Sequence, residues 1–163
     1  MSIERSIVKQ SHNQYLLAFK MLENILNAAT EEIYNKKVGS HIFWQQILHA
    51  LMGSYFWFRT VKSKFNEPFI EKKYYSELEK DPENIMPIKD LKAFFHTVNK
   101  QVTNYFNILD DNTIFKPCVL YPKLSNYEII SMQIRHMMYH VGYLNGLLSE
   151  YEHKTIPWLD YFG

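Results

Sequence analysis

Apolar residues recur every three or four positions along most of this chain, which is the spacing of amphipathic helices. One such stripe predicts a first helix over residues 13–35. Ser40 can cap a second helix that begins at His41 and continues to about Phe65, and its many apolar residues predict burial on most sides. We therefore expect two helices in the first part of the chain.

The remainder of the chain predicts two more helices. Pro87 fits the first turn of a helix that ends near Asp110, and Ser125 with Glu128 forms a capping box that opens a helix to about Tyr151. Residues 66–86, which mix prolines with charged side chains, predict a long crossover connection. The tail, residues 155–163, is too aromatic for a solvated terminus, so we expect it to pack on the helices or on a second subunit.

Together these elements predict an all-α fold, a four-helix bundle with a long crossover between helices 2 and 3. Only 5 glycines and 6 prolines occur in the chain, which agrees with long helices. A chain of 163 residues can bury one sizeable core but leaves little room for a second domain. We expect a single helical bundle domain over residues 1–163.

Composition and charge exclude several classes of protein. The chain has 18 Lys and Arg against 17 Asp and Glu, a net charge of +1, so it has no basic field for nucleic acid or an anionic membrane. No run approaches the roughly 20 apolar residues of a membrane-spanning helix. The first residues lack the apolar core of a signal peptide, so we expect a cytoplasmic protein. Cys118 is the single cysteine, so histidines and carboxylates must supply any metal ligands.

His136 and His140 are the most informative residues of the chain. Residues four apart lie on one helix face, with Cβ atoms roughly 6 Å apart, and this face also carries apolar residues such as Leu144. Two inward-facing imidazoles need partners, and a metal ion satisfies both. His49, on a helix expected to be buried, is the best third ligand, although a core histidine hydrogen-bonded to a carbonyl or glutamine is the alternative. Three neutral imidazoles leave coordination positions open, as in catalytic zinc sites.

Other polar residues accompany the histidines. Three glutamines on or beside the histidine faces can accept the second ring N–H and fix the ligating tautomer: Gln45, Gln46 and Gln133. Tyr143, one turn beyond His140, is a candidate hydrogen-bond donor to a metal-bound substrate. His41 lies two turns before His49 and stays outside the predicted ligand set, because it can equally face water.

This arrangement resembles the DinB-like (YfiT-like) family of four-helix-bundle metalloproteins, in which a helix-2 histidine and an H-x-x-x-H pair on helix 4 hold a divalent metal. The matching residues are His49, within Ile47-Leu48-His49-Ala50-Leu51, and the pair His136 and His140. Gly142 and the long connection between helices 2 and 3 also resemble the family, so the resemblance spans nearly the whole chain. It implies a bundle that is often dimeric and binds zinc or nickel, with some members acting as thiol S-transferases for bacillithiol or related low-molecular-weight thiols.

Three functional hypotheses follow. The first is a metal-dependent enzyme of thiol S-transfer, in stress or detoxification chemistry, whose small-molecule substrates include a low-molecular-weight thiol activated by the three-histidine metal. The second is a metal-dependent hydrolase that uses a metal-bound hydroxide at the same ligands. The third is a non-catalytic bundle that binds metal or a partner through its aromatic surface. The same aromatic surface favours a homodimer.

Overall fold

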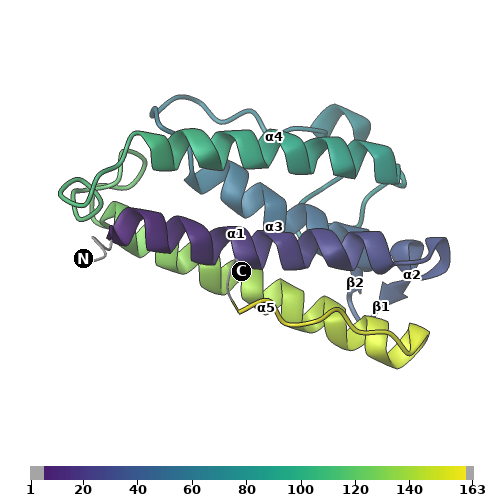
Figure 1. The fold of residues 1–163 in the computed structure, drawn as a ribbon. Coiled ribbons are helices and arrows are strands. Elements are labelled where there is room, and N and C mark those ends of the chain that lie inside the picture. Colours follow the sequence, from purple (N-terminus) through teal and green to yellow (C-terminus); the bar gives the residue numbers. More distant parts are fainter. Residues whose placement is uncertain (1–5, 161–163) are drawn as a thin grey trace.

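Helices dominate the computed structural model, which describes residues 6–160 (Figure 1). Its long helices are α1 (Ile7–Ala28), α3 (Phe43–Trp57), α4 (Ile88–Asn107) and α5 (Asn126–Glu152). The short elements are α2 (Glu31–Asn35), β1 (Lys37–Val38), β2 (His41–Ile42) and the 3-10 turn η1 (Ile70–Lys72). The all-α prediction is therefore confirmed. Within residues 6–160, none of the helices combines the length and the apolarity needed to cross a bilayer.

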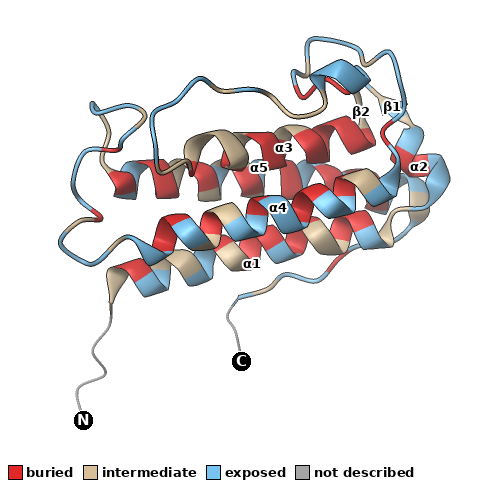
Figure 2. Ribbon diagram, turned by 90° about the horizontal axis from the view of Figure 1, so that it is seen from above, coloured by how far each residue is buried: buried red, intermediate tan, exposed pale blue. Residues whose placement is uncertain are grey.

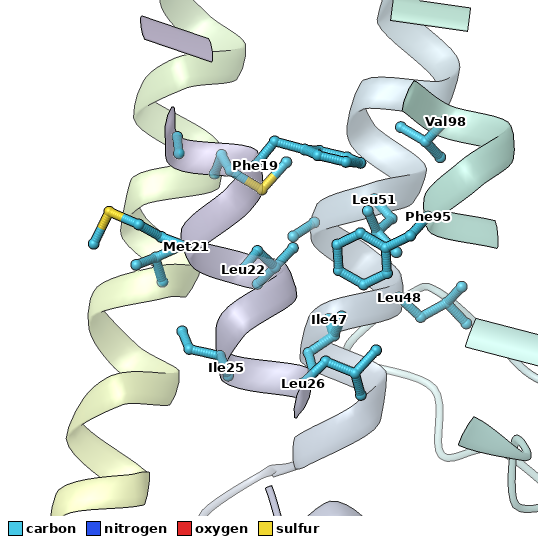
Figure 3. Packing of buried hydrophobic residues seen from close by; sticks show 14 of the residues in the cluster. Phe19, Met21, Leu22, Ile25, Leu26, Ile47, Leu48, Leu51, Phe95 and Val98 are labelled. Carbon is cyan, nitrogen blue, oxygen red and sulfur yellow. The ribbon is translucent and has the colours of Figure 1, made fainter. Parts of the chain in front are cut away.

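The long helices run alongside one another around one core. α5 packs against α1 and α3, and α4 packs against α3 and α1. Figure 2 shows buried residues on the inward sides of these helices and exposed residues on their outer sides. In Figure 3, Leu22 of α1, Leu48 of α3 and Phe95 of α4 lie in this shared core. Removing such apolar surface from water, at about 25 cal/mol per Å², is the main source of stability.

The helix predicted over residues 13–35 is divided into α1 and α2. The break falls at Ala29 and Thr30, whose extended backbone ends α1. The Thr30 hydroxyl then caps α2 by accepting the N–H of Ile33 at 3.4 Å. Ile33 is buried, as are most apolar residues of α1, so the apolar spacing continues across the break and conceals it. α1 also begins earlier than predicted, directly after its N-cap, Ser6.

The start of the second helix also differs from the prediction. Val38 pairs with His41 in a short antiparallel hairpin, and Gly39 adopts a φ of +61° in the turn between them. His41 therefore belongs to β2 rather than to a helix. Ser40 lies in the turn and does not cap α3, whose N-cap is Ile42.

The second helix ends at Trp57, well before the predicted end near Phe65. Arg59 stabilises the reversal of the chain, because its Nε donates to the Phe56 carbonyl at 3.0 Å. Its guanidinium lies 4.6 Å from the centroid of the Phe56 ring and 4.9 Å from that of Phe65. Phe65 therefore packs against the side of α3 after the helix has ended. Its apolar character comes from this contact, and the sequence pattern could not distinguish it from a continuation of the helix.

The last two long helices agree with the sequence. α4 follows Pro87, and the connection from α3 to α4 is the predicted long crossover, with η1 as its regular turn. The capping box of α5 is confirmed: the Ser125 hydroxyl accepts the Glu128 N–H at 3.2 Å, and the Glu128 carboxylate accepts the Ser125 N–H at 2.8 Å. This cap fixes the start of the helix that carries His136 and His140.

The C-terminal tail runs back along α5 (Figure 1). Ile156 is buried, and its N–H donates to the Asn145 side chain at 2.9 Å. Trp158 is 67% exposed, so it does not pack on the helices of this chain, and its packing on a second subunit stays a prediction. Tyr161 and Phe162, also expected to pack, lie outside the described residues.

Candidate metal centre

Three imidazole rings meet between α3 and α5. His49 belongs to α3, and His136 and His140 belong to α5. The His49 ring centroid lies 5.1 Å from that of His136 and 4.9 Å from that of His140, and the two α5 rings are 4.8 Å apart. One nitrogen from each ring lies within 4.8 Å of the others. These three histidines are therefore close enough to bind one metal ion.

Helix periodicity places these rings together. His136 and His140 are four residues apart on α5, which packs directly against α3. Gln46, His49 and Gly53 are spaced three and four residues apart on α3, so they share the face of that helix. The site residues of each helix thus lie on the face that packs against the other helix. Regular α-helical geometry is enough to bring the three rings together.

Hydrogen bonds at Nδ1 set the orientation of two of the rings. His49 Nδ1 lies 3.0 Å from the Ser76 carbonyl oxygen, and His140 Nδ1 lies 2.7 Å from Gln46 Oε1. Both oxygens can only accept, so each Nδ1 carries the proton and each Nε2 keeps a lone pair. That is the tautomer in which Nε2 can bind a metal.

The third ring, His136, is held differently. Its Nδ1 is buried and has no hydrogen-bond partner among the described residues. Its Nε2 lies 3.2 Å from His140 Nε2, close to the roughly 3.3 Å expected between two nitrogens bound at about 2.0 Å to one tetrahedral ion. Because His140 Nε2 carries a lone pair, His136 Nε2 must either donate a proton to it or share a cation with it.

Gly53 allows the His136 ring to approach α3. A Cβ atom at this glycine would lie 2.7 Å from His136 Cε1 and 2.9 Å from Nδ1, closer than real Cβ contacts. Glycine in a helix interior costs about 1 kcal/mol relative to alanine. This position therefore gives up some helix stability and leaves room for the imidazole.

Burial keeps all three rings neutral. It lowers the pKa of His49. Burial, and then the neighbouring His49, lowers the pKa of His136 to about 4. Burial, followed by the charges of His136, His49 and His41, lowers the pKa of His140 to about 3. Near neutral pH a metal ion would therefore meet three neutral imidazoles and would not have to compete with imidazolium protons.

The other predicted site residues are distributed unevenly. Gln46 makes the contact to a ring N–H that we expected of the glutamines. Gln45 instead uses its amide N–H groups as donors to carbonyl oxygens of the crossover. Gln133 is buried on α5. The Tyr143 hydroxyl donates to the Val38 carbonyl at 3.5 Å, so the structure places it toward β1, and its role as a substrate donor stays a prediction.

Sequence reasoning missed two participants. The Ser76 carbonyl is a main-chain group, and no side-chain pattern reveals which carbonyl of a crossover will face a helix. Gly53 did carry a signal, because an isolated glycine inside a helical pattern, four residues after His49, often marks a close approach.

No protein-family model matches the chain, and comparisons with the curated proteins and with the solved structures also give no match. By itself the structure defines a helical protein with three histidines close enough to bind one ion. The resemblance to the DinB-like family stays a prediction. The donor set does not select the metal, because imidazoles accept zinc, nickel, copper and iron.

Replacing Gly53 tests whether room at α3 positions the His136 ligand. In Gly53→Ala the new methyl group must displace the His136 ring, so we expect zinc affinity to fall about tenfold or more although every histidine is retained. Calorimetric titration with zinc measures the change. Gly146→Ala is the matched control, since a Cβ at this α5 glycine meets nothing within 4 Å. Equal zinc affinity in the two variants would contradict this role of Gly53.

Proposed function

We propose that His49, His136 and His140 hold a divalent metal ion, zinc or nickel, and that the protein is a metal-dependent enzyme of thiol S-transfer. The observation that carries the proposal is the convergence of three neutral ring nitrogens from α3 and α5. Two of these rings have their Nδ1 atoms bound to fixed acceptors, so the Nε2 atoms of His49 and His140 are free to bind metal.

The ligand number favours catalysis over a structural role. Three protein ligands leave a fourth position for a small molecule on a tetrahedral ion, whereas structural zinc sites are closed by four protein ligands. His49 and His136 are only partly buried, so the site lies within reach of solvent. The Ser76 carbonyl and the Gln46 side chain orient two of the rings from the buried side. A small molecule would therefore reach the ion from the side that is open to solvent.

The charge of the site favours a thiol as substrate. The cluster contains imidazoles and no carboxylate, so a bound divalent ion would keep its full positive charge and would lower the pKa of a thiol that approaches it.

The arrangement of one histidine on α3, a pair on α5 and a long crossover supports the further proposal that this is a DinB-like bundle. A homodimer belongs to the same proposal.

Metal content tests the proposed centre. We expect the wild-type protein, loaded with zinc or nickel and then desalted, to retain about one equivalent by mass spectrometry. His49→Ala and His136→Ala should each lose most of it, because two imidazoles bind far more weakly than three. His96→Ala is the control, since this histidine is exposed on α4. Wild-type protein that retains no metal after loading would exclude the metal centre.

Thiol transfer tests the reaction. With L-cysteine and 1-chloro-2,4-dinitrobenzene, the sulfur forms a bond to the aryl carbon, chloride leaves with its bonding electrons, and the thiol proton passes to water. We expect the zinc-loaded protein to accelerate this reaction. The rate with His136→Ala should be at least about tenfold lower than that of the wild type, and the rate with His96→Ala should equal it. Absorbance of the thioether product follows the rate.

Two outcomes of the thiol assay would redirect the assignment. Consumption of ester substrates by water without any need for thiol would favour the hydrolase hypothesis. A protein that retains one metal ion but turns over neither thiols nor esters would favour a non-catalytic metal-binding bundle.

A further inference from the structure

Three side chains at four-residue spacing attach the crossover to α3. His41 at β2, followed by Gln45 and His49 of α3, all face residues 75–80 of the crossover. His41 Nδ1 lies 3.0 Å from the Leu78 carbonyl oxygen, and His49 Nδ1 lies 3.0 Å from the Ser76 carbonyl oxygen. The crossover is therefore held by donors from β2 and from α3, the helix that supplies one of the proposed metal ligands.

Gln45 is the central member of this set. It is completely buried, and its Nε2 lies 3.2 Å from the Tyr75 carbonyl oxygen, 2.9 Å from that of Glu77 and 2.7 Å from that of Lys80. Tyr75 and Glu77 are the residues on either side of Ser76. One amide group thus binds the carbonyls directly before and after the carbonyl that orients His49.

The crossover has little regular structure of its own at this point. Residues 75–80 contain no helix or strand, so their carbonyl groups must find donors elsewhere when buried. Replacing the Gln45 amide with an apolar group would leave three carbonyl oxygens without this donor. The Ser76 peptide would then keep its side-chain hydrogen bond to Glu67 but would lose the Gln45 contacts on either side of it, which help to direct its carbonyl at His49.

We propose that Gln45 is a positioning residue of the metal centre, acting through the Ser76 carbonyl on His49. This inference rests on the proposed metal site. It has a reciprocal consequence, because coupling between two binding events is equal in both directions. If the ordered crossover strengthens metal binding at His49, then a bound metal must stabilise the attachment of residues 75–80 to α3 by the same factor.

Gln45→Met tests the proposal, since methionine has a similar length and no N–H donor. We expect its zinc affinity to fall about 10- to 100-fold, the usual effect of losing a group that orients a metal ligand. Gln101→Met is the matched control, because Gln101 also donates from Nε2 to a main-chain carbonyl, that of Tyr55, away from the triad. Its zinc affinity should equal that of the wild type.

Amide hydrogen exchange provides a second readout that needs no variant. The N–H groups of Lys80 and Glu83 donate to the carbonyls of Glu77 and Lys73, both at 3.2 Å, and so report the order of the crossover. We expect zinc to slow their exchange in the wild-type protein. In Gln45→Met this effect of zinc should be lost, and in Gln101→Met it should persist.

The outcomes separate this inference from the function on which it rests. Wild-type protein that binds no zinc would overturn the proposed metal centre and this inference together. Zinc binding that depends on His49 but is equally tight in a folded Gln45→Met protein would overturn the positioning role alone. Should Gln45→Met not fold, the wild-type exchange decides: slower exchange with zinc supports the coupling, and unchanged exchange at Lys80 and Glu83 contradicts it.

Discussion

The molecule depends on holding three neutral imidazoles between α3 and α5, two of them through hydrogen bonds at Nδ1. A buried ring nitrogen without a partner costs free energy, so each N–H needs an acceptor. Gln46 supplies one for His140 and the Ser76 carbonyl supplies one for His49. These same bonds leave the Nε2 lone pair of each ring free, and that of His140 lies 3.2 Å from His136 Nε2. The arrangement that satisfies the buried N–H groups is therefore also the arrangement of a metal ligand set.

The long crossover is part of this arrangement. Loops of this length are usually the variable part of a fold, yet here a row of side chains from β2 and α3 binds its main chain. The Ser76 carbonyl is the point at which crossover and site meet. A helix pair alone would bring the histidines together, but it would not choose which nitrogen of His49 faces the other rings.

Much of the fold could be predicted from the chain because its determinants are local. The capping box at Ser125 and Glu128 and the apolar spacing of the last two long helices mark elements that the structure contains. Apolar spacing could not reveal the break at Thr30, since buried residues keep the same spacing on both sides. It also overextended α3, because Phe65 is apolar for a tertiary reason, its packing against a helix that has already ended.

Helix spacing predicted the pair His136 and His140, and the expected burial of the second helix pointed to His49 as the third ring. The contact of Gln46 with His140 was also expected, but the orientation of His49 could not be predicted. Orientation depends on Ser76, which the chain brings from 27 residues away and uses only through its main chain. The central claim is that these three rings bind one ion. X-ray absorption at the zinc edge of the loaded protein tests it most directly. We expect three imidazole nitrogens at about 2.0–2.1 Å in the wild type and fewer in His49→Ala; a zinc spectrum without imidazole scattering, or one unchanged by that substitution, would contradict the account.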